Sequence, residues 1–264
     1  MRVIITRPEQ DAADWVRRLS ERGHEVLALP LIAIAPAPDS QPLRLAWQHL
    51  SGYHALMFVS GNAATQFGAA QESGSLADWA QRAPQTRAWA TGPGTRRALL
   101  RSGVAATLID APDAGQFDSE ALWSLVGGSV RPGQRVLIVR GSDAQVAQDA
   151  SPGGVGRDWL ARRLRDAGAE VDFVVAYVRS APQGPALRLA LAQAAAQDGS
   201  IWLFSSSEAI SNLLRLLPQQ DWSAARALAT HPRIAQVARD AGFGVVWESR
   251  PSLKDVVASI ESQT

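Results

Sequence analysis

The chain has 264 residues, a formal net charge of +1 and a hydrophobic content of 46%. This length allows two modest domains or one large one, each with a real core. The near-neutral charge argues against a nucleic-acid partner, and the absence of cysteine excludes disulfides, thiolate zinc sites and cysteine nucleophiles. With no signal-peptide pattern and no apolar run of about 18 residues, we expect a cytoplasmic protein that does not enter the membrane.

The first half of the chain alternates between predicted strands and helices. Short apolar runs predict strands, and apolar residues at helical spacing predict the helices between them. In chain order we predict a strand at Val3–Thr6, a helix at Asp11–Arg22, an extended run at Val26–Ile34, strands at Ala55–Val59 and Thr86–Ala90, a helix ending at Gly103, and a strand at Val104–Leu108.

The second half repeats these modules. Val136–Val139 echoes the first strand, and Phe204–Ala209 echoes Phe58–Ala63. We predict a helix at Asp158–Ala167, strands at Val171–Val178, Ile201–Phe204, Arg226–Ala229 and Val245–Trp247, and a helix ending at Gly242. The insertion Ser142–Gly156 is predicted to be a mobile loop. Alternating strands and helices favour an α/β class with parallel sheets.

Two proline-rich segments set the expected domain layout. Residues 36–42 follow the first copy of the opening module and residues 180–185 follow the second. Proline at this density does not continue a helix or a central strand. The N-terminal piece is too short for its own core. We therefore predict a discontinuous domain, 1–35 plus 186–264, and a continuous domain, 43–179, rather than a simple split near residue 130.

The sequence contains none of the familiar catalytic motifs. Instead, residues with hydroxyl groups follow several of the predicted strands. Ligands of open α/β sheets bind beyond the carboxyl ends of the strands, where helix N-termini present free N–H groups. Ser and Thr at such positions also cap helices without any ligand. The candidate substrate-binding residues are Thr6, Arg7, Ser60, Gly61, Asn62, Thr91, Gly92, Thr95, Arg140, Gly141, Ser205, Ser206, Ser207, Thr230 and His231.

Tyr177 is the candidate catalytic residue, with a structural alternative. It is one of two tyrosines and lies in a predicted strand, where the alternation of residues 174–178 would point its ring into a cleft. A core tyrosine whose hydroxyl is bonded within the protein is the other interpretation. The four histidines are scattered and show no metal-ligand spacing, so we expect no metal site.

The order and spacing of these motifs resemble the uroporphyrinogen-III synthase family over nearly the whole chain. The residues that carry the resemblance are Thr6-Arg7-Pro8, Pro30-Leu31-Ile32, Phe58–Ala63, Thr91-Gly92 with Thr95, Arg140-Gly141, Gly156-Arg157, Tyr177 with Arg179, Phe204 with Ser206, and His231–Ile234. His231 and Ile234 depart from the family pattern, which has Gly and Thr there. The resemblance implies two flavodoxin-like (Rossmann-type) domains joined by a two-strand β-ladder.

The resemblance also implies a cofactor-free enzyme, expected to be a monomer. Its substrate would be hydroxymethylbilane, a linear tetrapyrrole that is dehydrated and closed, with inversion of its last ring, to uroporphyrinogen III. Tyr177 would assist departure of the hydroxyl, and Thr95 would lie at the cleft. Helix N-termini would hold the substrate carboxylates. The alternative is a non-catalytic two-domain ligand-binding or sensor protein, which would bind its ligand without isomer selectivity.

Overall fold

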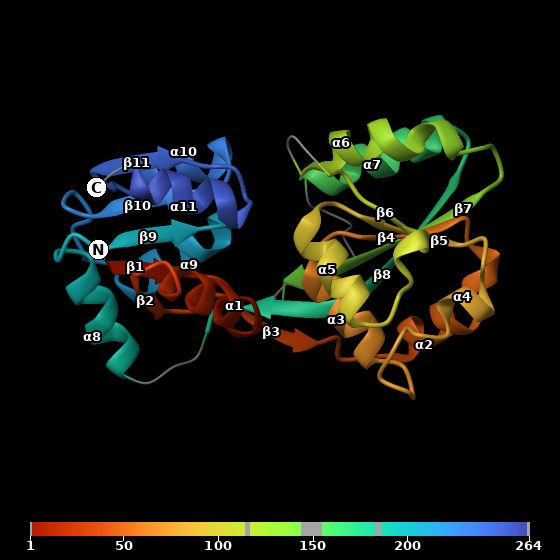
Figure 1. Ribbon diagram of the computed structural model, residues 1–264, viewed down its shortest axis with the longest axis horizontal. Helices are drawn as coiled ribbons and strands as arrows, with labels where there is room; N and C mark the ends of the chain where they lie inside the picture. The colour runs from red at the N-terminus through yellow and green to blue at the C-terminus, as the bar shows by residue number, and fades with distance from the viewer. Residues whose placement is uncertain (1, 114–116, 144–154, 183–185, 263–264) are drawn as a thin grey trace. The chain divides into compact units, whose positions relative to one another are not determined.

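The computed structural model describes residues 2–113, 117–143, 155–182 and 186–262 (Figure 1). The strands are β1 (Arg2–Ile5), β2 (Glu25–Ala28), β3 (Ala33–Pro36), β4 (Ala55–Phe58), β5 (Arg87–Ala90), β6 (Ile109–Asp110), β7 (Arg135–Asp143), β8 (Glu170–Ser180), β9 (Ile201–Phe204), β10 (Arg226–Ala229) and β11 (Val245–Glu248). The α-helices are α1 (Glu9–Ser20), α2 (Gln41–Gln48), α3 (Gly61–Ala69), α4 (Trp79–Arg82), α5 (Pro93–Arg101), α6 (Ser119–Val126), α7 (Val155–Asp166), α8 (Ala186–Ala195), α9 (Ser207–Leu216), α10 (Pro232–Asp240) and α11 (Leu253–Glu261).

The chain forms two compact units. Unit 1 consists of Met1–Ala33 with Ser180–Thr264, and unit 2 is Ile34–Arg179. Each unit holds one sheet, and the chain passes from unit 1 to unit 2 and back. None of the helices in the described part of the chain is long and apolar enough to span a bilayer.

Unit 1 is built on a five-stranded sheet in the order β11-β10-β9-β1-β2, and every adjacent pair is parallel. Successive side chains of a strand point to opposite faces. Val3 and Ile5 accordingly pack with α1 and α11 on one face. Trp202 and Phe204 instead join Trp222 and Phe243 in an aromatic cluster.

Unit 2 is built on a six-stranded sheet in the order β3-β8-β7-β4-β5-β6. Leu56 and Phe58 of β4 face a core shared with α2, α3, α4 and α5. Ala55 and Met57 face a second core, which α6 and α7 cover. The sheet is therefore buried on both faces, as its continuous apolar strands require.

The two sheets share one strand order. If β7, β8, β4, β5 and β6 are taken as equivalents of β1, β2, β9, β10 and β11, both sheets have the sequence second-first-third-fourth-fifth of a flavodoxin-like fold. These are the pairs of segments that the internal repeat matches. In unit 2 the module that is first in unit 1 comes last along the chain, and β3 lies beside β8 at the sheet edge.

Several predicted elements differ in detail. The extended run Val26–Ile34 is two strands, β2 and β3, that belong to different sheets. The predicted strand Val104–Leu108 is wrong: Ala106–Leu108 is a 3₁₀ helix, and the short β6 follows it. Of the predicted loop Ser142–Gly156, the first two residues end β7 and the last two begin α7, whereas 144–154 lie outside the described residues.

The first proline-rich segment is also more regular than expected. Pro36 ends the edge strand β3, where proline removes no central ladder bond. Pro42 lies in the first turn of α2, where the missing N–H has no helical partner to lose. Only Ala37–Ser40 therefore lies outside a regular element in this part of the chain.

Candidate functional site

One group of predicted site residues lies at the carboxyl edge of the unit 2 sheet. β7, β4 and β5 are parallel neighbours, so the residues that follow them emerge at the same edge. Ser60 follows β4, Thr91 follows β5, and Gly141 lies in the last part of β7. Tyr177 pairs with Gly141 from the adjacent strand β8. The structure thus brings these four positions together within one unit.

Ser60 caps α3. Its backbone is extended, and its Oγ accepts a hydrogen bond from the N–H of Ala63 at 3.2 Å. The side chain is only partly buried. Asn62 lies in the first turn of the same helix. A Cβ added to Gly61 would lie 3.4 Å from Cβ of Ala98, close to ordinary van der Waals contact, so the start of α3 lies against α5.

The N-terminus of α5 begins without a side-chain cap. Gly92 occupies the N-cap position, and Pro93 starts the helix. The hydroxyl of Thr91 lies 3.4 Å from both the carbonyl of Val59 and the hydroxyl of Thr95. Thr95 is 5% exposed. A helix N-terminus without a side-chain cap suits a carboxylate ligand, because its first N–H groups and its dipole favour negative charge.

A β-bulge in β8 determines where Tyr177 points. Arg140 pairs with Val175, but Gly141 pairs with Tyr177, so Ala176 is an extra residue in β8. The Ala176 carbonyl accepts a hydrogen bond from the N–H of Ala37 at 3.2 Å. Because of the extra residue, Val174, Ala176 and Tyr177 all join the core beneath α3 and α5. The simple alternation expected over residues 174–178 is wrong.

Tyr177 is buried and bonded within the protein. It is 3% exposed, and its hydroxyl lies 3.0 Å from Oγ of Ser60. Its ring covers the backbone of Gly141 so closely that a Cβ there would lie 2.4 Å from Cζ of the tyrosine. Gly141 is therefore required where the ring lies, and any side chain at this position would displace it.

Arg140 lies on the other face of the sheet. Its guanidinium carbon is 4.7 Å from the ring centroid of Phe173, which packs against the core under α6 and α7. Arg140 and Gly141 were both predicted to bind substrate, but the Arg140 side chain lies on the face opposite to the one where Tyr177 covers the Gly141 backbone. Arg179, two residues beyond Tyr177, pairs with Asp143 at 2.6 Å.

The second group of predicted residues lies at the carboxyl edge of the unit 1 sheet. Thr6 and Arg7 follow β1, Ser205 and Ser206 follow β9, and Thr230 and His231 follow β10, while Ser207 begins α9. These strands are parallel neighbours. These predicted residues therefore emerge at one edge of the unit 1 sheet.

Several of the unit 1 residues have structural partners. Thr6 is 1% exposed, and its hydroxyl donates to the carbonyl of Leu203 at 2.7 Å. Ser206 caps α9 by accepting from the N–H of Glu208. Nδ1 of His231 accepts from the N–H of Arg233 at 3.1 Å, so histidine here serves as a helix cap. Thr230 is 6% exposed.

The contacts of Arg7 and Asn212 could not be predicted from the sequence pattern. The guanidinium of Arg7 stacks 4.4 Å from the ring centroid of Trp15, which lies in the second turn of α1. Asn212, which sequence reasoning missed, is 3% exposed and donates to the carbonyl of Leu31 at 2.6 Å. A polar residue on the apolar face of a helix was the available signal. Its contact fixes the segment that follows β2.

Fold and site together define a two-unit α/β protein with hydroxyl groups and helix N-termini at the carboxyl edges of both sheets. The family model described as Uroporphyrinogen-III synthase HemD matches residues 13–258. The chain therefore belongs to the uroporphyrinogen-III synthase family.

Curated relatives carry the same family name. The chain is 27% identical over 252 residues to uroporphyrinogen-III synthase of Escherichia coli strain K12, with 92% of each chain covered. It is 30% identical over 142 residues to the enzyme of Chlorobaculum parvum, and this match spans about half of each chain, 53%.

Solved structures share the fold. The uroporphyrinogen-III synthetase of Helicobacter pylori matches with a TM-score of 0.56 at 14% identity and full coverage of both chains. A mutant uroporphyrinogen III synthase of Thermus thermophilus matches with a TM-score of 0.53 at 15% identity, covering 99% of this chain and 98% of that chain. At these identities, both likenesses bear on the fold alone.

Proposed function

We propose that this chain closes hydroxymethylbilane to uroporphyrinogen III, with loss of water and inversion of the last pyrrole ring. The family match over residues 13–258 carries this proposal. Members of the family are hydro-lyases of tetrapyrrole biosynthesis. Such an enzyme must control which isomer forms, because its product differs from that of simple closure only in the orientation of one ring.

The hydroxyl-rich strand ends suit such a substrate. Hydroxymethylbilane carries carboxylates on every pyrrole, and helix N-termini bind carboxylates through backbone N–H groups. The uncapped start of α5 at Gly92 is one such position in unit 2. Holding several carboxylates would bend the linear chain so that its two ends meet, which lowers the entropic part of the barrier.

Tyr177 is the proposed source of the proton that the leaving hydroxyl takes up. A phenol acts as a general acid when it lies within hydrogen-bond reach of the leaving group, directly or through one intermediary. Loss of the hydroxyl gives an azafulvene, which the last ring attacks to form a spiro intermediate. Fragmentation and reclosure then give the inverted ring. Positioning supplies most of the catalysis, in keeping with the missing acid–base motifs.

The product isomer tests the proposed activity. Purified chain is mixed with freshly made hydroxymethylbilane, and the products are oxidised and separated as type I and type III isomers. We expect type III to dominate, whereas buffer and heat-denatured protein give the type I isomer of unassisted closure. Type I alone, above or at the background rate, would exclude this function.

A further inference from the structure

The hydroxyl groups of Ser60 and Tyr177 lie together at the carboxyl edge of the unit 2 sheet, and the two residues differ in exposure. Tyr177 is 3% exposed, whereas Ser60 is only partly buried at the start of α3. Their oxygens are 3.0 Å apart. We propose that the Ser60 hydroxyl, rather than the Tyr177 phenol, meets the leaving hydroxyl, and that Tyr177 supplies its proton through Ser60. This inference rests on the proposed function.

The ring of Tyr177 has little room to reach a substrate itself. It lies among the buried residues beneath α3 and α5, and the backbone of Gly141 closes one side of it. The bulge at Ala176 is held by the hydrogen bond from Ala37. A substrate at the sheet edge therefore reaches Ser60 before it reaches the phenol.

The relay requires the Tyr177 phenol to donate to Ser60, and the Ser60 hydroxyl has a lone pair that can accept. A serine hydroxyl has one proton to donate and two lone pairs that accept. One lone pair accepts from the N–H of Ala63 at 3.2 Å. When the phenol of Tyr177 donates to the other, the Ser60 proton is left for a third group. That group is the leaving hydroxyl.

The proposed step balances without any other reactant. The carbon–oxygen bond of the hydroxymethyl group breaks, and both electrons remain on the oxygen. The oxygen takes the Ser60 proton and leaves as water, while Ser60 takes the Tyr177 proton and leaves a phenolate. The pyrrole nitrogen lone pair stabilises the carbon as a protonated azafulvene. The proton that the last ring loses on final closure returns to the phenolate through Ser60.

The test is a double-mutant cycle of Ser60→Ala and Tyr177→Phe, measured as kcat for type III product. We expect each single variant to lose about 10²-fold or more, as for a lost general acid, with KM nearly unchanged. The double variant should lose no more than the worse single variant. Ser60→Thr, which keeps a hydroxyl, should recover most of the loss.

Two further variants separate the relay from the helix cap. Ser60→Asn still caps α3 but has no hydroxyl, so we expect it to lose as much kcat as Ser60→Ala. Ser252→Ala removes the matching cap of α11, whose Ser252 Oγ accepts from the N–H of Asp255 at 3.1 Å. This control should lower the melting temperature and leave kcat unchanged.

Other outcomes overturn the relay. If Tyr177→Phe costs as much in the Ser60→Ala background as in the wild type, the phenol acts directly. If Ser60→Ala raises KM alone, Ser60 only binds substrate. A wild-type chain that makes no type III isomer contradicts the proposed function itself, which is a distinct result from either of these.

Discussion

Gly141 and the ring of Tyr177 are in direct contact across the β7–β8 pair, and a Cβ at position 141 would lie 2.4 Å from Cζ of the tyrosine. We expect Gly141→Ala to push the ring away from Ser60 and to lower kcat. Overpacking of a well-packed core typically costs about 1–3 kcal/mol of folding free energy, so the variant should still fold. The isomer assay and urea unfolding measure the two effects.

A second glycine provides the control for this change. Gly52 has open space around the position of an added Cβ and an ordinary backbone conformation. Gly52→Ala should leave both kcat and stability near the wild-type values. Full activity in Gly141→Ala would show that the ring position does not matter, and would return Tyr177 to a purely structural role.

Thr6 is expected to stabilise unit 1 through its hydroxyl. The side chain is 1% exposed, and Oγ1 donates to the carbonyl of Leu203 at 2.7 Å, joining the ends of β1 and β9. Thr6→Val leaves that carbonyl without its donor, at a cost of about 1–3 kcal/mol in the free energy of unfolding. Thr6→Ser keeps the donor and should recover much of the loss.

Chemical denaturation measures the free energy of unfolding of the two Thr6 variants. If KM rises in Thr6→Val by a factor much larger than its loss of stability accounts for, the hydroxyl also contacts substrate. The sequence pattern cannot separate these roles, because the same threonine at a strand end serves as a binding group or as an internal donor. Burial decides between them, and it depends on neighbours that are distant in the sequence.

The repeated strands were predictable because each one is a short apolar run followed by a small polar residue. Val3–Thr6 and Ile201–Phe204 correspond closely to β1 and β9. The division of the run Val26–Ile34 into two strands was not predictable, because an apolar segment shows no sign that it leaves one sheet and enters another. Pro30 was the available clue, and it lies between β2 and β3.

The direction of Tyr177 could not be predicted from the sequence. Strict alternation places residues 175 and 177 on one face, whereas the extra residue Ala176 turns Tyr177 to the face of Val174. A bulge depends on how two strands pair, and β8 itself carries no glycine or proline at that position. The partner, Gly141, was found as a motif residue, but its steric role was not.

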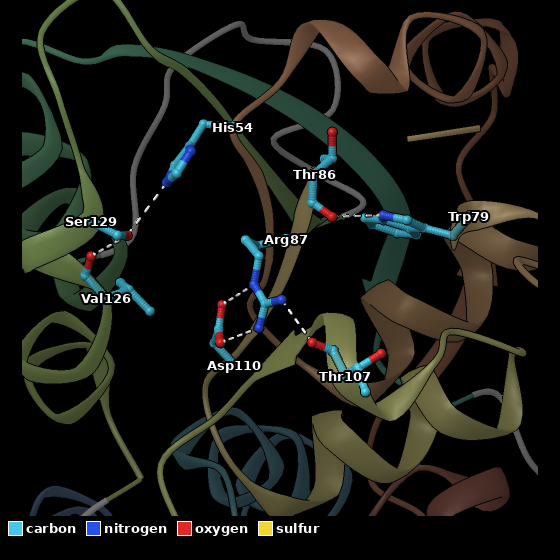
Figure 2. A network of polar contacts seen from close by, with 8 residues as sticks. All are labelled: His54, Trp79, Thr86, Arg87, Thr107, Asp110, Val126 and Ser129. Atoms are coloured by element: carbon cyan, nitrogen blue, oxygen red, sulfur yellow. Dashed lines mark hydrogen bonds and ion pairs between the residues drawn. The ribbon is translucent and has the colours of Figure 1, made fainter. Parts of the chain in front are cut away.

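Thr86 contacts Leu50, Tyr53 and Trp79 at the amino end of β5. Figure 2 shows its contact with Trp79. Its hydroxyl lies 2.8 Å from the carbonyl of Tyr53 and 3.1 Å from that of Leu50, and its own carbonyl accepts from Nε1 of Trp79 at 3.0 Å. Thr86→Val keeps the shape but removes the donor, so we expect a loss of about 1–3 kcal/mol.

Urea unfolding measures the stability of Thr86→Val and of a control variant, Thr107→Val, which changes an exposed side chain. Thr107 contributes its backbone carbonyl to Arg87, and that contact survives the substitution (Figure 2). Thr107→Val should change stability little. Equal effects of the two variants would contradict the assignment of the stabilisation to the Thr86 hydroxyl.

His54 should make unit 2 less stable in mild acid. Its ring lies edge-on to Trp89 with centroids 5.8 Å apart. Its Nε2 is 3.4 Å from Oγ of Ser129 (Figure 2). Burial lowers the pKa of His54 below its ordinary value. Asp110 partly opposes this pKa shift, while Arg87 and Arg131 add to it.

The sign of the effect follows from which state binds the proton. Below about pH 6.5 the unfolded chain protonates His54 while the folded chain does not, so the free energy of unfolding falls until the pH reaches the folded pKa. His54→Gln removes this contribution. We expect the wild type to lose more stability than His54→Gln between pH 7.5 and 5.5 in urea titrations. A wild-type loss no greater than that of His54→Gln would assign the acid sensitivity elsewhere.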